Sequence, residues 1–296
     1  MAFEVRPIQP KFAGAVFDLD LRGPLTDGDI AAVHASMDKY AVMVFHGQHE
    51  LTNDEQVAFT KRLGPREVNI RTNVIAVTDR RLDGNFADVS NLDQDNKIWA
   101  KNSRRRIFEF ANRLWHSDGI SRIIPTHYSV LYGHTVVPAG GDTEYVDMRQ
   151  AYETLDAKLK AEVEGLVCEH SIMYSREQLG FSGWTEAEKE DYKPVLQRLV
   201  RSLPATSRKS LFMSSHIGGI VGWPRPEAMA YIRDLIEHAT QRQFVYAHKW
   251  TQGDLIIWDN RVTMHRGRRY DDQKYVRDLR RTTTMCEGPT VEQQAI

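Results

Sequence analysis

Several features that mark other classes of protein are scarce or missing in this 296-residue chain. There are only two cysteines, Cys168 and Cys286, too few for a disulfide framework and too far apart for a zinc motif. No apolar run approaches the roughly 18 residues of a membrane span. The first residues lack the apolar stretch of a secretory signal peptide. These absences predict a cytoplasmic protein with two unpaired thiols and no membrane partner.

The chain also lacks a charge excess, internal repeats and linkers rich in glycine, proline or serine. The 39 basic and 40 acidic side chains give a formal net charge of −1, which argues against a nucleic-acid partner. Hydrophobic residues make up 41% and charged residues 27%, ordinary values for a globular protein. We therefore expect a single domain over residues 1–296 and a small-molecule partner, with assembly into a homo-oligomer.

Hydrophobic periodicity predicts a mixed order of elements. A capping box of Thr52 and Glu55 predicts that a helix begins there and runs to about Leu63. Helical spacing also predicts helices over 27–40 and 149–166. Alternation or short apolar runs predict strands over 15–21, 41–45, 114–118, 128–137, 143–148, 244–250, 255–258, 262–265 and 277–284. Residues 79–112 are polar and without a pattern, which indicates long loops, with one short strand, of the kind that form lids.

This order predicts a fold that is mostly β with helical additions. Antiparallel strands joined by tight turns and long excursions are typical of a double-stranded β-helix, or jelly roll. A helical and irregular insertion is expected at about 149–235.

Two segments far apart in the chain supply a candidate set of metal ligands. His116 and Asp118 are two residues apart, so on a strand both side chains would lie on one face. His265 closely follows an apolar strand and could complete the set. Two imidazoles and one carboxylate with open positions are the ligands of a non-haem Fe(II) oxygenase. The same three residues could also hold zinc in a hydrolase.

An arginine twelve residues after His265 extends this interpretation. A 2-oxo diacid that chelates Fe(II) needs a cation for its distal carboxylate, and the planar guanidinium binds a carboxylate through two hydrogen bonds. Arg277 and Arg281 share one face of the predicted strand and are both candidates. Thr143 could add a hydroxyl to the same carboxylate, although a β-branched residue is also common in a strand for structural reasons.

The chain resembles the TauD/TfdA family of Fe(II)- and 2-oxoglutarate-dependent dioxygenases, and most of all its 2,4-dichlorophenoxyacetate (2,4-D) branch. The likeness runs almost from end to end. It is carried by Leu114-Trp115-His116-Ser117-Asp118, Gly140-Gly141-Asp142-Thr143 with the residues to Tyr152, 237–241, 253–261 and Met264-His265-Arg266-Gly267 with the residues to Asp271.

The resemblance implies a role for each matching residue. His116, Asp118 and His265 match the iron ligands, and Thr143 and Arg277 match the residues that hold 2-oxoglutarate. The implied substrate is an aryloxyalkanoate, with Fe(II) as cofactor and 2-oxoglutarate and O2 as co-substrates. Candidate contacts for the substrate are Lys97, His216, Ile120 and Arg71. Where the 2,4-D branch has Ser-Ser-Phe after the ligand motif, this chain has Gly119-Ile120-Ser121, which indicates a different pocket shape.

Three alternatives remain at this point. The same chemistry could act on another small anion, such as an alkylsulfonate, an aryloxypropionate or a natural aromatic acid. A zinc hydrolase would use the same three ligands without O2. A binding protein on a jelly roll would have no catalytic activity.

Overall fold

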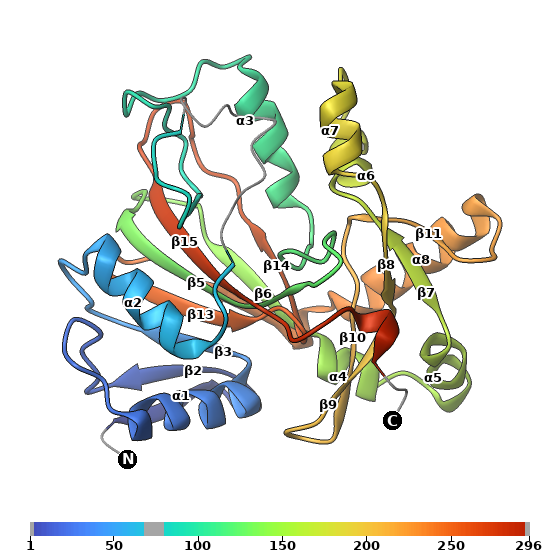
Figure 1. Ribbon diagram of the computed structural model, residues 1–296, viewed down its shortest axis with the longest axis horizontal. Coiled ribbons are helices and arrows are strands. Elements are labelled where there is room, and N and C mark those ends of the chain that lie inside the picture. Colours follow the sequence, from blue (N-terminus) through green and yellow to red (C-terminus); the bar gives the residue numbers. More distant parts are fainter. Residues whose placement is uncertain (1–2, 68–79, 294–296) are drawn as a thin grey trace.

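A computed structural model describes residues 3–67 and 80–293 (Figure 1). Its largest sheet has seven strands in the order β1-β2-β3-β13-β5-β15-β4. Their bounds are Glu4–Gln9 (β1), Phe12–Phe17 (β2), Val42–Phe45 (β3), Leu255–Asp259 (β13), Thr126–Thr135 (β5), Asp278–Met285 (β15) and Ala87–Asp88 (β4). All neighbouring strands are antiparallel except β2 and β3, which are parallel.

Three smaller sheets complete the β structure. One has the order β12-β6-β14, with bounds Val245–His248, Thr143–Asp147 and Thr263–Gly267. Another has the order β11-β7-β8, with bounds Ile217–Ile220, Val167–His170 and Val195–Arg198. The third is the hairpin of β9 (Val200–Leu203) and β10 (Arg208–Leu211).

Period-two alternation gives the seven-stranded sheet two different faces. Met43, Val130 and Ile257 lie on the outer face in one apolar cluster, covered by helices α1 (Asp27–Tyr40) and α2 (Asn53–Leu63). Their chain neighbours lie on the inner face, in a cluster with Tyr145 of β6. The two sheets therefore pack face to face, which is the predicted double-stranded β-helix core.

Helices also cover the outer side of the β12-β6-β14 sheet. Val146 and Met264 point away from the inner core into a third apolar cluster, with Ala228, Ile232 and Leu235 of α8 (Arg225–Ala239). The remaining helices are α3 (Arg104–Glu109), α4 (Met148–Glu153), α5 (Ala157–Glu164), α6 (Ile172–Glu177) and α7 (Glu186–Asp191), with short 3-10 helices η2 (Phe110–Arg113), η3 (Arg242–Phe244) and η4 (Thr290–Glu292).

The predicted helix at Thr52 is confirmed, with both hydrogen bonds of its capping box present. Other predicted boundaries are wrong. Residues 149–166 form two helices, α4 and α5, because Asp156 caps a new helix after a break. Residues 149–235 also contain five strands, β7 to β11, so the insertion is not simply helical. The region 79–112 contains α3, whose first turn is capped by Ser103.

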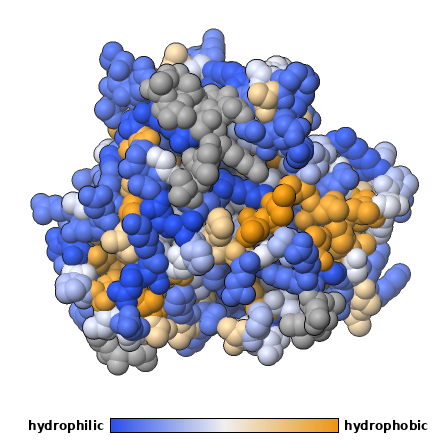
Figure 2. Space-filling view, viewed as in Figure 1, coloured by the Kyte–Doolittle hydropathy of each residue, from blue (hydrophilic) through white to orange (hydrophobic). Residues whose placement is uncertain are grey.

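The surface in Figure 2 is mainly hydrophilic, with hydrophobic residues gathered on the right, over the region of β7, β8 and β11. Leu196 of β8 and Val221 after β11 are exposed apolar side chains. Within the described ranges, no helix is both long and apolar enough to cross a membrane.

Candidate metal centre

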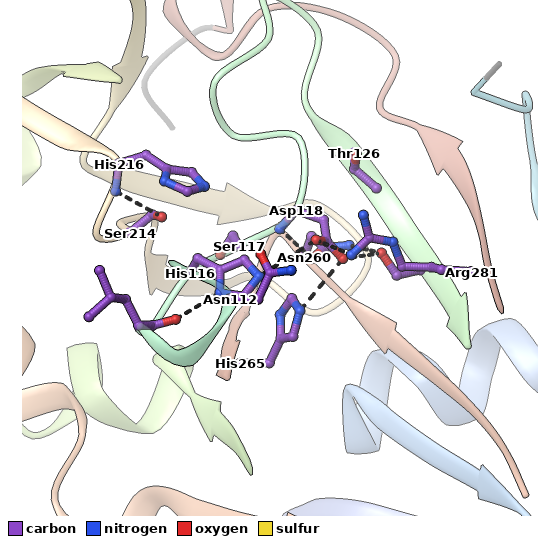
Figure 3. Close-up of polar contacts among 12 residues, drawn as sticks. Asn112, His116, Ser117, Asp118, Thr126, Ser214, His216, Asn260, His265 and Arg281 are labelled. Carbon is purple, nitrogen blue, oxygen red and sulfur yellow. Dashed lines mark hydrogen bonds and ion pairs between the residues drawn. The ribbon is translucent and has the colours of Figure 1, made fainter. Parts of the chain in front are cut away.

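Three buried side chains converge between the two facing sheets, as Figure 3 shows. One ligand atom from each of His116, Asp118 and His265 lies within 4.8 Å of the others. The Asp118 carboxylate is 3.9 Å from Nε2 of His116 and 3.7 Å from Nε2 of His265. The structure therefore brings together the three residues that the sequence motifs predicted.

The backbone around these ligands differs from the predicted strand over 114–118. His116 forms only an isolated bridge with His265, through hydrogen bonds of 3.0 and 2.7 Å in the two directions. Asp118 begins a turn, in which Gly119 has a φ of +61° and a Cβ would lie 2.1 Å from Oγ1 of Thr126. The turn ends the extended run, and the single bridge places His116 beside His265.

Hydrogen bonds fix the orientation of the ligands. Nδ1 of His116 lies 2.8 Å from the carbonyl of Leu114, to which it donates, so Nε2 is the free ligand atom. Ser129 donates to Asp118 at 2.7 Å. The backbone N–H of Asp118 donates to the side chain of Asn260, which itself donates to Ser129. This network holds the carboxylate before any ion binds.

The protonation states also suit a cation. Burial opposes the ionisation of Asp118, but the nearby charge of Arg281 outweighs it, and the pKa of Asp118 is about 2. Burial lowers the pKa of His116 and His265, so both imidazoles are neutral at physiological pH. Metal ligands must be deprotonated, and all three residues meet that requirement. An N2O donor set of this kind fits Fe(II).

A cavity of about 110 Å³ is lined by two of the three ligands, His116 and His265. Thr143, Arg277 and Arg281 line the same cavity. The guanidinium of Arg277 is held by the carbonyls of Val89 and Gly141, each at 3.3 Å. Three predicted co-substrate residues from β6 and the β15 region therefore reach one space beside the metal ligands.

Arg277 and Arg281 have different partners. Arg277 is 9% exposed, and no carboxylate of the described residues lies within ion-pair distance of it. Arg281 donates to the carboxylate of Asp118. Arg277 is thus free to bind an acidic ligand, whereas Arg281 compensates the charge of a metal ligand.

The predicted substrate contacts are only partly brought together. His216 is buried, and its ring centroid is 5.9 Å from that of His116. Ile120 is fully buried but does not line the cavity; its carbonyl accepts from Gln197. Arg71 lies outside the described residues.

The structure does not place Lys97 at this site, contrary to the prediction. Its side chain is 77% exposed and lies 3.9 Å from Asp95. The reason is a tight turn in which the backbone of Lys97 pairs with Asp93, so that the side chain points to solvent. Trp99, two residues later, does line the cavity.

Several cavity residues were not predicted as part of the site. Asn112, Arg106 and Tyr270 line the cavity, from the region 104–113 and from the loop after β14. Tyr270 lies in a quoted family motif, but no pattern gave any of the three a role, and only the folded chain brings them together. Asn260 was quoted in a family motif, but its contacts with Asp118 and Ser129 could not be inferred from that motif.

Comparison with known proteins agrees with this geometry. Residues 4–283 match the model of the family described as taurine catabolism dioxygenase TauD, TfdA family. The chain belongs to this family and is an Fe(II)- and 2-oxoglutarate-dependent dioxygenase. Because the chain belongs to this dioxygenase family, the two alternatives of a zinc hydrolase and a non-catalytic binding protein are excluded.

Individual relatives cover nearly the whole chain. It is 41% identical to the alpha-ketoglutarate-dependent 2,4-dichlorophenoxyacetate dioxygenase of Cupriavidus pinatubonensis, over 97% of this chain and 99% of the relative. It is 34% identical to the (S)-phenoxypropionate/alpha-ketoglutarate-dioxygenase of Sphingobium herbicidovorans, over 91% of each chain. A crystal structure of AAD-2 in complex with Mn(II) and N-oxalylglycine is 51% identical, with a TM-score of 0.93 over 98% of this chain and 100% of that one.

Proposed function

We propose that this dioxygenase hydroxylates the carbon next to the ether oxygen of an aryloxyalkanoate such as 2,4-D. The product would collapse to a phenol and glyoxylate, while 2-oxoglutarate gives succinate and CO2. The observation that carries the proposal is that His116 and His265, which cluster with Asp118, line one cavity together with Arg277 and Thr143. The 41% identity to a relative named for 2,4-D supports the choice of substrate.

In this proposal, Nε2 of His116, the carboxylate of Asp118 and Nε2 of His265 hold Fe(II). The ion, when bound, supplies the activation of O2 that hydroxylation requires. Arg277 is a better anchor than Arg281 for the distal carboxylate of 2-oxoglutarate, because Arg281 is engaged with Asp118. Thr143 adds a hydroxyl, which also accepts a 2.9 Å hydrogen bond from Trp250.

The protein also has to position the substrate. The hydrogen-bonded ligands fix the position of the ion beside the cavity, so a substrate bound in the cavity would present its target C–H at a defined place. His216 remains a candidate contact because it lies next to His116. Ile120 is a candidate determinant of pocket shape through its place in the turn that follows Asp118.

The second candidate substrate is an aryloxypropionate. A relative at 34% identity is named for (S)-phenoxypropionate, and residues 119–121 depart from the pattern of the 2,4-D branch. A panel of 2,4-D, both enantiomers of a phenoxypropionate, an alkylsulfonate and a natural aromatic acid separates these options. We expect 2,4-D to give the highest kcat/KM, scored by succinate release with detection of the phenol. Succinate release that depends only on the alkylsulfonate would contradict the proposed substrate.

Two further predictions from the sequence belong to this proposal: assembly into a homo-oligomer and a cytoplasmic location. Light scattering on the purified protein tests the first. Fractionation of the source cells tests the second.

A further inference from the structure

A second cavity lies apart from the metal centre, lined by residues of β8, β9 and β10 and of the segment that follows β15. Its volume is about 540 Å³, which is in the range of small-molecule sites. Among the described residues, none lines both this second cavity and the one beside the metal ligands. Figure 1 shows the end of the chain next to β8, where the backbone N–H of Arg198 donates to Thr290 at 3.0 Å. The second cavity is therefore a separate candidate for ligand binding.

Positive charge predominates among the side chains that line the second cavity. They include four basic residues and two exposed acidic ones, which are Arg198, Arg201, Lys209 and Arg261, and Glu164 and Glu287. Lys209 pairs with Glu164 at 3.0 Å. Arg261 pairs with Asp259 at 2.7 Å. The other two basic residues, both arginines, form no ion pair in the described part of the chain.

Arg201 of β9 is the most buried of these cations, at 5% exposed. Its Nε has no hydrogen-bond partner, and its Nη1 contacts the sulfur of Cys286, a weak acceptor, at 3.6 Å. The guanidinium lies 4.8 Å from the ring centroid of Phe212. Burying a guanidinium without strong acceptors costs free energy, so this arginine indicates that a ligand supplies them.

Two other residues of the same lining repeat this pattern. Nε of Arg198 and Nε2 of His127 are buried and have no hydrogen-bond partner. The carboxylate of Asp259 is 3.8 Å from Nε2 of His127, which is too far for a hydrogen bond. Burial lowers the pKa of His127 to about 3, so this imidazole is neutral and adds a polar atom without a charge. Three residues around one cavity thus have polar nitrogens that no described group satisfies.

The chemistry of these groups selects the kind of ligand. A guanidinium binds the oxygens of a carboxylate, sulfate or phosphate through two parallel hydrogen bonds, and burial strengthens such charge-assisted bonds. Val200, Pro204 and Ala205 also line the second cavity and offer apolar contacts. The lining therefore suits an oxyanion, with space for an apolar body attached to it.

We propose that the second cavity is a binding site for an oxyanion, held by Arg201 and Arg198 and separate from the active site. The oxyanion is either a free inorganic ion or the acidic group of a small organic molecule, since both present the same oxygens. This inference goes beyond the proposed function and does not depend on the identity of the oxidised substrate.

Calorimetric titration with inorganic sulfate and with benzenesulfonate tests the proposal. The active site is first filled with Mn(II) and N-oxalylglycine, so that Arg277 is not available to the probe. Titration with sodium chloride at the same ionic strength corrects for general screening.

The test compares Arg201→Gln with the matched variant Arg176→Gln. Arg176 is buried to the same degree, at 4% exposed, and its guanidinium lies 4.4 Å from the ring centroid of Phe108. It does not line the second cavity. The two variants therefore remove a similar side chain, but only one removes it from the proposed site.

We expect wild type to bind at least one of the two probes with a dissociation constant of about 1 mM or lower. In Arg201→Gln this constant should rise at least about tenfold, the usual effect of losing a charge-assisted hydrogen bond. Arg176→Gln should change it less than about twofold. Arg201→Lys keeps the charge without the planar fork and should recover part of the affinity.

The two probes distinguish the sources of the oxyanion. Equal constants for sulfate and benzenesulfonate would identify a site for a free inorganic ion. Binding of benzenesulfonate at least about tenfold tighter would identify a site for an organic acid whose apolar body contacts Val200 and Pro204.

Wild-type protein that gives no more heat with either probe than with chloride would overturn the proposal. Equal affinities in Arg201→Gln and Arg176→Gln would also overturn it, because the probe would then bind elsewhere. If Arg201→Gln does not fold, Arg198→Gln takes its place, since Arg198 is only partly buried. Wild-type affinity in that variant would contradict the assigned site.

Discussion

The two faces of the seven-stranded sheet are built from the same strands but have different roles: one packs against helices and the other contributes to the metal centre. On the outer face, Met43, Ile257 and Val130 form a continuous apolar row, paired across β3, β13 and β5. On the inner face, the row next to it continues from Ile256 through Leu131 to Arg281, which contacts Asp118.

The difference shows how a period of two separates stability from chemistry. Side chains on one face pack under α1 and α2, while their chain neighbours reach the metal centre. Ser129, between Tyr128 and Val130, donates to Asp118 from the inner face. Changes on the inner face should therefore alter activity, and changes on the outer face should alter the free energy of unfolding.

The largest effect is expected for the metal ligands. His116→Ala or Asp118→Ala should lower succinate formation by at least about 100-fold, because losing a ligand exceeds the effect of losing its hydrogen-bond partner. Asp118→Ala should also lower the melting temperature, because it leaves the guanidinium of Arg281 without its carboxylate partner. Coupled succinate assays and calorimetry measure the two quantities. Succinate formation at the wild-type rate in either variant would refute the assigned ligands.

A core change on the outer face should give the opposite pattern. Ile257 is fully buried, and Ile257→Ala should lower the free energy of unfolding by roughly 2–5 kcal/mol. Assayed well below its melting temperature, the variant should keep kcat/KM within about twofold of wild type. Urea denaturation and steady-state kinetics check this prediction. A large loss of kcat/KM with unchanged stability would remove the distinction between the faces.

The turn before β13 offers a pH-dependent test away from the metal. Burial opposes the ionisation of Asp254, but hydrogen bonds from His248 and His46 lower its pKa from 3.8 to about 2. Because the folded pKa is the lower one, the stabilisation is complete above pH 3.8 and is lost as pH falls towards 2.

Asp254→Asn should therefore cost roughly 2 kcal/mol at neutral pH. The cost should shrink between pH 4 and pH 2, as followed by urea denaturation at each pH. A cost that does not depend on pH would show that the carboxylate is not held ionised as described.

The smallest effect is expected at Ser129. Ser129→Ala removes a hydrogen bond to Asp118 and should weaken Fe(II) binding by about tenfold. Ser210→Ala is the control, since Ser210 is also fully buried but bonds only to the carbonyl of Leu211. Titration with Fe(II) under anaerobic conditions compares the two. Equal affinities in both variants would remove Ser129 from the metal centre.

The sequence was most informative where a local rule determines structure. The capping box of Thr52 and Glu55 predicted the start of α2, and the apolar runs of β3 and β13 predicted buried strands. The spacing of His116, Asp118 and His265 predicted the group that the structure brings together.

Other features depend on tertiary contacts that no local pattern encodes. Alternating residues at 114–118 resembled a strand, but the packing of Gly119 against Thr126 turns the chain there. Lys97 is basic and near the right segment, yet its turn directs it to solvent.

The most direct measurement is the visible charge-transfer absorption of the protein with Fe(II) and 2-oxoglutarate under anaerobic conditions, before and after 2,4-D is added. We expect a weak band that shifts with 2,4-D, is absent in His116→Ala and needs more 2-oxoglutarate in Arg277→Gln. That result would join the metal ligands, the co-substrate anchor and the substrate in one cavity. The absence of a band with the wild-type protein would contradict the metal centre. A band that does not shift when 2,4-D is added would contradict the aryloxyalkanoate pocket.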